Sequence, residues 1–409
     1  MKKLQSNPVV LVFLFVAACF LTYQITFSAT DKFWKDRIDD MLSDDTADVS
    51  PGLSELSDTV MANYLYSADE ETLSDGVKAG YVSALPDNFS MYLDEEQYKN
   101  YLDFENNSNN IGIGVNTLYD SSLDGILVIN VYKGSPAEGA GMVPGDLITA
   151  VGGVDVDSKG YYGTMALLAT GTEGETVTVS VRKRTGVNAE LTMTKNAVKS
   201  ERITGEKLTD NIGLIRIDSF EQGDDAAFKD VLQSLITRDC EKFVIDVRNN
   251  PGGNIETISG MLDFVSPDGA MFTITDKSDA KNTVTSDANA VPYPFAVLIN
   301  ERTVCGAELF ASVLSQGETN MLFGVNTYGK PSVQNVFKLA EGGAVSISTV
   351  KYLPSLGDDF DGVGVKPDKE VRLSDDALLR FTTLTKDEDA QLQAAIEYLK
   401  TQKQTTEKD

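Results

Sequence analysis

The chain has 409 residues, 42% of them apolar, which is enough to form two to three domains with buried cores. It contains no histidine, which excludes a Ser-His-Asp triad, a Cys-His pair and a histidine-ligated zinc, so a general base must be Lys, Asp, Glu, Tyr or the terminal amine. The net charge of −27 argues against a nucleic-acid partner, and the three cysteines form no metal-binding motif, so we expect no metal and no other cofactor.

The amino terminus sets the expected compartment. Residues 9–29 carry no charge, and a run of about 20 apolar residues is long enough to span a bilayer. Lys2 and Lys3 precede this run and acidic residues follow it, which predicts a body outside the cytoplasm. We predict that residues 1–30 form a membrane anchor or signal segment, and that the protein crosses the cell membrane once. A lipoprotein acylated at Cys19, or a secreted form after signal cleavage, are the alternatives.

Residues 31–107 have apolar side chains at helical spacing. Two such series are Leu53, Leu56, Val60, Met61 and Tyr64, and Leu73, Val77, Tyr81, Val82 and Leu85. We predict an N-terminal helical arm that supports the rest of the chain or joins two copies in a homodimer.

Residues 108–197 have a different pattern, with short runs rich in Val, Ile and Thr that predict strands. The expected strands are 126–132, 147–151, 176–183 and 189–195, with a short helix inside 134–141, a tight turn at 143–146 and a helix at 159–168. This β-rich segment with two helices resembles a PDZ domain of the circularly permuted kind found in bacterial proteases.

That resemblance implies a peptide-binding loop. In PDZ domains a glycine loop presents N–H groups to the terminal carboxylate of a peptide, which adds to the sheet as a strand. The matching residues here are Ile111, Gly112, Ile113, Gly114 and Val115. The alternative is that these glycines only form a tight turn.

Residues 198–380 alternate between strand and helix patterns, which predicts a largely parallel α/β sheet. The expected strands include 213–217, 242–247 and 295–299, and the expected helices include 224–237 and 307–314. Loops after parallel strands gather at one edge, so loops 248–254 and 301–306 are expected to meet. Residues 381–409 are expected to form a C-terminal helix and tail, with a capping box from Thr385 to Glu388.

Cys305 lies where a buried strand turns into a helix, and a helix amino terminus favours a thiolate. The N–H of Gly306 is then expected to face a developing oxyanion, with a second donor from Gly252 or Gly253. Lys330 follows 25 positions after the cysteine and Gln334 lies 4 beyond it, which suggests a nucleophile, a base and an orienting amide.

Three motifs make the resemblance to a known family specific. They are Asp246-Val247-Arg248-Asn249-Asn250-Pro251-Gly252-Gly253, Tyr328-Gly329-Lys330-Pro331-Ser332-Val333-Gln334 and Gly364-Val365-Lys366-Pro367-Asp368. From about residue 35 to 372 the chain resembles the carboxyl-terminal processing (tail-specific) peptidases, which have a helical arm, a PDZ domain and a crotonase-like α/β core.

The resemblance implies an extracytoplasmic endopeptidase that captures proteins or peptides with free C-termini and cleaves them through an acyl-enzyme. By motif, Lys330 is the general base, Gln334 orients it, and Gly306 with Gly252 or Gly253 forms the oxyanion hole. Where the family has a serine nucleophile, the frame here reads Cys305-Gly306-Ala307-Glu308. The nucleophile position is therefore occupied by Cys305.

This substitution leaves two interpretations. An unperturbed thiol titrates at about 8.5 and a lysine at about 10.4, so a Cys–Lys pair is able to rest as thiolate and ammonium in an active peptidase. Sulfur is also larger than oxygen, which favours an impaired relative that acts as a peptide-binding or scaffold protein. Residues 170–175 also lack an arginine that the family often carries in its PDZ domain, so activation that depends on it is in question.

Overall fold

The computed structural model describes residues 50–105, 111–169, 171–198, 201–209, 211–287 and 290–402. The predicted anchor at residues 1–30, with Cys19, lies outside this range. Among the described residues, no helix is both long enough and apolar enough to cross a bilayer. The chain divides into two compact units, one ending at Leu73 and the other starting at Ser74.

The arm is helical as predicted, but it also contains a strand. Its helices are α2 (Ser50–Asn63), α3 (Glu70–Ser83) and α4 (Glu95–Glu105). Between α3 and α4 the short strand β1 (Met91–Leu93) pairs antiparallel with β18 (Ala344–Pro354). Segment 87–93 is therefore attached to the core sheet, because its backbone finds hydrogen-bond partners on the edge of β18.

The β-rich domain forms one antiparallel sheet in the order β3-β4-β5-β7-β8. Its strands are β3 (Val115–Leu118), β4 (Ile126–Val131), β5 (Leu147–Val151), β7 (Thr176–Arg182) and β8 (Asn188–Thr194), with the short β2 (Ile111–Gly112), β6 (Val154–Asp155) and β9 (Asn196–Ala197). Helices α5 (Pro136–Gly139) and α6 (Val156–Ala169) complete it, so the four predicted strands and both helices are confirmed. Strand β3 forms one edge of this sheet.

The core contains a second sheet in the order β10-β11-β12-β15-β16-β19. These strands are β10 (Ile203–Thr209), β11 (Ile212–Ile217), β12 (Lys242–Asp246), β15 (Phe295–Ile299), β16 (Met321–Gly324) and β19 (Lys369–Glu370). The pairs from β11 to β19 are all parallel, as predicted.

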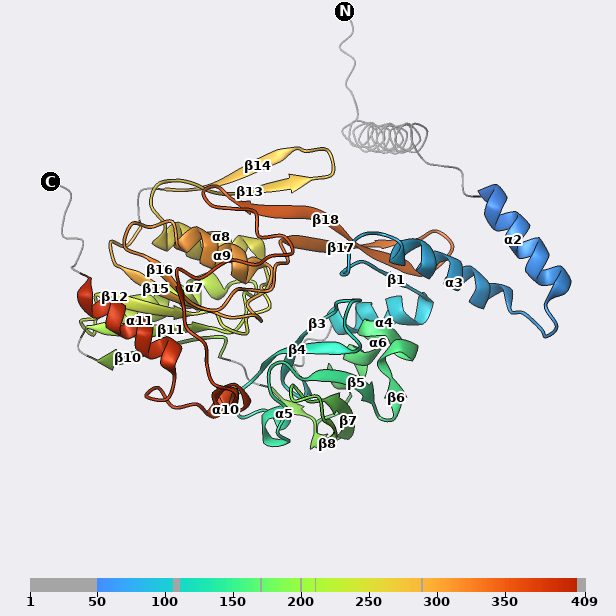
Figure 1. The fold of residues 1–409 in the computed structure, drawn as a ribbon, viewed down its shortest axis with the longest axis horizontal. Helices are drawn as coiled ribbons and strands as arrows, with labels where there is room; N and C mark the ends of the chain where they lie inside the picture. The colour runs from blue at the N-terminus through green and yellow to red at the C-terminus, as the bar shows by residue number, and fades with distance from the viewer. Residues whose placement is uncertain are drawn as a thin grey trace, which may run out of the picture. The chain divides into compact units, whose positions relative to one another are not determined.

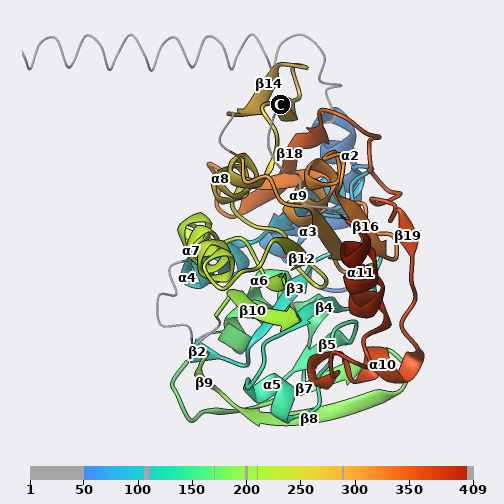
Figure 2. The ribbon, with the colours of Figure 1, turned by 90° about the vertical axis from the view of Figure 1, so that its left-hand side faces the viewer.

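Helices cover both faces of this sheet, because successive side chains of a strand point to opposite faces. Phe243 and Ile245 pack in a cluster with α7 (Asp224–Ile236), α8 (Ile255–Val265) and α9 (Gly306–Leu314). Val244, between them, packs in another cluster with α11 (Ala390–Thr401). Figures 1 and 2 show α8 and α9 close together, with α11 apart from them across the strands.

A third sheet is built on the long strand β18, which pairs with β1, with β13 (Gly269–Asp276) and with β17 (Ser332–Lys338). Strand β14 (Lys281–Ser286) extends it beyond β13. The pairing of β17 with β18 is irregular between Val333 and Gln334. Such irregularities re-aim side chains next to active sites, and this one lies beside the predicted orienting amide.

The C-terminal helix is present, but its predicted start is wrong. After α10 (Asp375–Leu379) and a short 3-10 helix (Phe381–Thr383), α11 begins at Ala390. Glu388 accepts hydrogen bonds from the Thr385 N–H at 3.1 Å and hydroxyl at 2.6 Å, which closes a turn. The helix cap is Asp389, which accepts from the N–H groups of Gln391 and Leu392.

Candidate active site

The two loops that were expected to meet do so. The Val304 N–H donates to the Asn250 carbonyl at 2.9 Å. A Cβ built on Gly252 would lie 2.8 Å from the Gly306 nitrogen and 3.2 Å from the Cys305 Cβ, and Gly252 has a φ of +94°. Only glycine fits there without a shift, because the backbone passes directly against the start of α9.

Cys305 is the N-cap of α9 and has a φ of 53° and a ψ of −118°. A non-glycine residue held in such a conformation typically costs about 1–3 kcal/mol, and these conformations concentrate at active sites. The side chain is partly exposed, and its Sγ donates to the Ser332 carbonyl at 3.6 Å. The residue therefore has the geometry of a nucleophile elbow, in which a sharp turn presents a side chain at a helix start.

The strained turn is held by Glu308, which is fully buried. Its carboxylate accepts from the N–H groups of Cys305 at 2.9 Å, Lys330 at 2.8 Å and Gly329 at 2.6 Å, and from the Thr327 hydroxyl at 2.5 Å. Burial raises the pKa of Glu308 above its ordinary value, and these four hydrogen bonds oppose that rise. One carboxylate thus fixes the cysteine turn and the lysine loop together.

Lys330 is buried, with 5% of its surface exposed. Its Nζ donates to the Ser332 carbonyl at 2.9 Å and to Gln334 Oε1 at 2.7 Å. The Ser332 carbonyl therefore receives both the lysine amine and the cysteine thiol. The amide nitrogen of Gln334, Nε2, donates to the Ser348 hydroxyl at 2.7 Å. This bond keeps the amide oxygen of Gln334 directed toward the lysine amine.

The two possible second oxyanion donors differ. The Gly252 N–H is already bonded to Asn250 Oδ1 at 2.8 Å. Within the part of the chain that the structure describes, no acceptor pairs with the N–H of Gly253 or of Gly306. The Gly253 nitrogen lies 3.6 Å from the position that a Cβ on Gly306 would occupy. Gly253 and Gly306 are therefore the neighbouring backbone donors that remain available beside Cys305.

The predicted peptide-binding loop lies in a separate groove. Ile111, Gly112, Ile113, Gly114 and Val115 all line a cavity of about 680 Å³. Tyr161, Met165 and Leu168 of α6 line it as well. Because β3 is an edge strand, this groove has the arrangement in which a peptide adds to a sheet beside a helix. Pro251, which precedes Gly252, also lines the groove.

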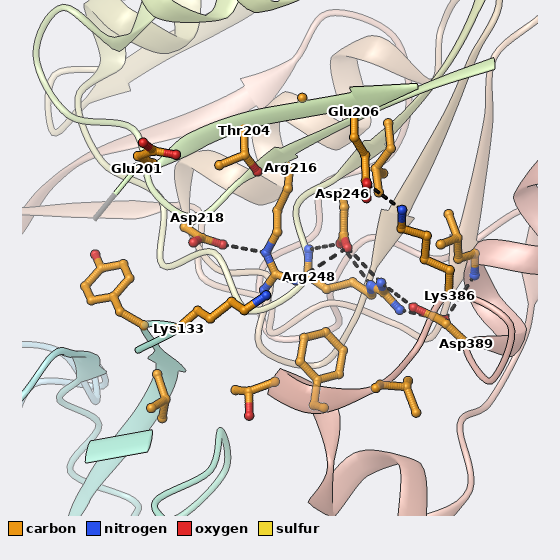
Figure 3. Close-up of a pocket in the computed structure, with 18 residues that line it drawn as sticks. Lys133, Glu201, Thr204, Glu206, Arg216, Asp218, Asp246, Arg248, Lys386 and Asp389 are labelled. Carbon is orange, nitrogen blue, oxygen red and sulfur yellow. Dashed lines mark hydrogen bonds and ion pairs between the residues drawn. The ribbon is translucent and has the colours of Figure 1, made fainter. Parts of the chain in front are cut away.

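Figure 3 shows another polar cavity, of about 690 Å³, next to β11 and β12. Arg248 bonds Asp246 and Asp389 there, each at 2.7 Å, and Arg216 bonds Asp218 at 2.7 Å. Burial alone would raise the pKa of Asp246, but the charges of Arg248 and Arg216 and the hydrogen bonds from Arg248 together outweigh it and hold the pKa below its ordinary value. These charges satisfy one another, which indicates a structural role for Asp246 and Arg248.

The geometry thus brings together Cys305, Gly306, Lys330, Gln334, Gly252 and Gly253. Sequence reasoning gave no role to four residues that support them, which are Glu308, Asn250, Ser348 and Phe89, the last with its ring centroid 4.8 Å from the Lys330 Nζ. For Glu308 the signal was present, because an acid three residues after an N-cap is the pattern of a capping box. The contacts of Ser348 and Phe89 depend on tertiary packing, whereas Asn250 also bonds the N–H of Gly252, two residues along the chain.

Comparison with known proteins gives two matches to family models. Residues 211–371 match the family model of peptidase family S41, and residues 127–183 match that of the PDZ domain. The carboxy-terminal processing protease CtpA of Bacillus subtilis (strain 168) is 29% identical over 332 residues, which cover 80% of this chain and 70% of that protein.

A second relative and one solved structure, both named as carboxyl-terminal processing proteases or peptidases, are also similar to this chain. The chloroplastic carboxyl-terminal-processing peptidase 2 of Arabidopsis thaliana is 29% identical over 76% of this chain and 62% of its own length. The solved structure of a photosystem II D1 C-terminal processing protease aligns with a TM-score of 0.65 at 22% identity, covering 80% of this chain and 89% of that one. At this identity the structural likeness supports the fold alone.

Proposed function

We propose that Cys305 is the nucleophile of a peptidase of the carboxyl-terminal processing type, a proposal supported by the matches to the models of peptidase family S41 and of the PDZ domain. The observation that carries this proposal is the shared carbonyl of Ser332, which accepts from Cys305 Sγ at 3.6 Å and from Lys330 Nζ at 2.9 Å. Thiol and amine therefore face the same point.

In the proposed reaction, Cys305 Sγ attacks the scissile carbonyl carbon, and its proton passes to Lys330. The carbonyl electron pair moves to oxygen, where the N–H groups of Gly306 and Gly253 stabilise it. The tetrahedral adduct then collapses, the C–N bond breaks and Lys330 protonates the leaving amine. Lys330 next takes a proton from water as the water oxygen attacks the thioester carbon. The C–S bond then breaks, the acid leaves, and Lys330 returns the proton to the Cys305 sulfur. Gln334 keeps the amine directed toward these atoms.

Substrate capture is proposed for the groove beside β3. The substrate class is proteins or peptides with a free C-terminus, whose last residues would add to β3 while apolar side chains contact Met165 and Leu168. The carboxylate would meet the loop from Ile111 to Val115. Since Pro251 lines the same groove, capture takes place near the loop that carries Gly253.

The proposed location is the cell membrane, with a single N-terminal span and an extracytoplasmic body. The uncharged run at residues 9–29, with lysines before it and acids after it, supports this orientation. A second copy of the chain is the proposed partner of the arm, because Leu56 and Met61 of α2 are 55% and 46% exposed. Charged substitutions at both positions are expected to shift the sedimentation coefficient from dimer to monomer.

The deciding experiment is cleavage of an unfolded protein with an apolar C-terminus by full-length protein in detergent. Cys305→Ala and Lys330→Ala are each expected to remove cleavage. Cleavage by Cys305→Ala at the wild-type rate would exclude Cys305 as the nucleophile. A Cys305→Ser variant that is faster than wild type would identify the thiol as the limiting feature of a competent site.

A non-enzymatic peptide-binding protein is the second candidate, favoured by the departure from serine at position 305. Alkylation by iodoacetamide at near-neutral pH distinguishes the two. An active peptidase is expected to be labelled at Cys305 much faster than at Cys240, which is buried and whose pKa burial raises. Equally slow labelling of both cysteines would favour the peptide-binding protein.

A further inference from the structure

Residues 87–90, which we call the 87–90 turn, lie against the amine of Lys330. The Lys330 Nζ is 4.8 Å from the centroid of the Phe89 ring. That ring also packs at a tilt against Tyr328, with 6.3 Å between centroids. The ammonium form of lysine at this distance is attracted by the negative face of an aromatic ring. The base proposed for the reaction is therefore in contact with a residue from outside the 211–371 family match.

The turn has a defined shape. Asp87 accepts hydrogen bonds from the Phe89 N–H at 2.9 Å and from the Ser90 hydroxyl. Ser90 is buried, and its hydroxyl accepts from the Ser348 N–H at 3.2 Å. The next residue, Met91, pairs with Ser346 in the β1–β18 ladder. The position of Phe89 is thus set from both ends of the turn.

Ser348 connects this turn to the amide that holds the lysine. Its hydroxyl accepts from Gln334 Nε2 at 2.7 Å, and Gln334 Oε1 in turn accepts from Lys330 Nζ at 2.7 Å. Burial alone would raise the pKa of Asp87. Hydrogen bonds from Ser90, Ser348 and the Phe89 N–H, together with the charge of Lys330, outweigh burial and hold that pKa below its ordinary value. The carboxylate of Asp87 accepts from the Phe89 N–H and the Ser90 hydroxyl, which keeps the shape of the turn beside Ser348.

We propose that Phe89 and Ser348 are positioning residues for the general base. Phe89 holds the Lys330 ammonium group from one side by a cation–π contact, and Ser348 fixes the Gln334 amide that holds it from the other. This inference rests on the proposed function, since it concerns the amine that moves protons there. It adds the 87–90 turn, from the segment before the PDZ domain, to the active site.

The test uses conservative pairs and a matched control. Phe89→Leu keeps apolar volume but removes the ring face, and Phe89→Tyr keeps the face. Ser348→Ala removes the hydroxyl, and Ser348→Thr keeps it. The control is Thr349→Ala on the same strand, whose hydroxyl accepts from the Asn335 amide at 2.5 Å without touching the lysine. Thermal melting of each variant checks that it is folded.

Phe89→Leu and Ser348→Ala are each expected to lower kcat about tenfold and leave KM within about twofold, because the amine loses orientation while substrate contacts remain. The Tyr and Thr variants are expected to retain kcat within about threefold. Thr349→Ala is expected to match wild type. Wild-type kcat in Phe89→Leu and Ser348→Ala, or an equal loss in Phe89→Leu and Phe89→Tyr, would overturn the proposal.

A labelling measurement separates this inference from the proposed function. If wild type does not cleave, the proposed function fails, and the rate of Cys305 alkylation by iodoacetamide then decides the positioning role. Slower alkylation in Phe89→Leu than in Phe89→Tyr would support it, because the amine beside the thiol has moved. Equal rates in wild type, Phe89→Leu and Ser348→Ala would overturn it.

Discussion

At the scale of single residues, Glu308 is the side chain on which the proposed site depends most. Its two oxygens receive four hydrogen bonds from the cysteine turn and the lysine loop. A glutamine has one acceptor oxygen, and its amide N–H₂ would face N–H donors. We expect Glu308→Gln to destabilise the core by about 2–4 kcal/mol and to remove cleavage.

Urea unfolding and the cleavage assay check this prediction. Glu318→Gln makes the same chemical change at an exposed position and is expected to behave like wild type. A Glu308→Gln variant with wild-type stability and cleavage would mean that the carboxylate does not hold the two segments together.

Gly252 gives a second residue-scale prediction, in which steric contact is separated from backbone strain. An alanine there would place Cβ 2.8 Å from the Gly306 nitrogen, at the site of the proposed oxyanion. Gly223 has a similar φ of +89° but nothing within 4 Å of the Cβ position. We expect Gly223→Ala to lower stability by about 1 kcal/mol with cleavage intact, and Gly252→Ala to remove cleavage. Parallel losses of stability and activity in both variants would contradict this account.

At the scale of elements, the sequence predicted the strands and helices that have a local apolar pattern. It missed elements whose structure depends on contacts with residues far away in the chain. Strand β15 begins and ends where its apolar run does, because a buried parallel strand is a continuous apolar stretch. The loops at 248–254 and 301–306 were placed together by the parallel topology alone. In contrast, β1 has only three residues and takes its structure from the edge of β18.

The start of α11 shows the same limit. Thr385 and Glu388 satisfy a capping pattern, and their side chains do interact, but the contact closes a turn. The helix begins after Asp389 because that carboxylate also binds Arg248, 141 residues away in the chain. A long-range ion pair of this kind has no local signal.

An element-scale prediction concerns the turn between β3 and β4, which contacts the lysine loop. The Tyr328 hydroxyl donates to Asp120 of that turn, and the Ser121 N–H donates to the Asn88 carbonyl at 2.8 Å. Tyr328 lies two residues before Lys330. We expect Tyr328→Phe to lower kcat by about three- to tenfold, because the loop loses a hydrogen bond to a carboxylate.

The control for this change is Tyr398→Phe on α11. It removes a hydroxyl that donates to the Thr319 carbonyl at 3.1 Å. Its kcat is expected to equal that of wild type. If both variants cleave equally well, the contact between the β3–β4 turn and the lysine loop does not contribute to catalysis.

At the scale of the whole molecule, the C-terminal helix is fastened to the central sheet by the buried group of Asp246, Arg248 and Asp389. Removing one member leaves a buried charge without its partner, so Asp246→Asn is expected to lower stability at pH 7 by about 3–5 kcal/mol. Because the charges of Arg248 and Arg216 and the hydrogen bonds from Arg248 hold the pKa of Asp246 below its ordinary value, Asp246 stabilises the fold above its unfolded pKa of about 3.9. That contribution to stability is lost as the pH falls from about 4 through the lower pKa that Asp246 has in the folded protein.

The wild-type protein is therefore expected to lose more unfolding free energy between pH 5 and pH 2.5 than Asp246→Asn loses, measured by urea unfolding followed by circular dichroism. Glu308, whose pKa burial raises, is present in both proteins, so the difference between the two curves isolates Asp246. Asp358→Asn, at an exposed position, should follow the wild-type curve. Parallel curves for wild type and Asp246→Asn would show that Asp246 titrates alike in the folded and unfolded chains, and that the ion pair does not contribute to acid sensitivity.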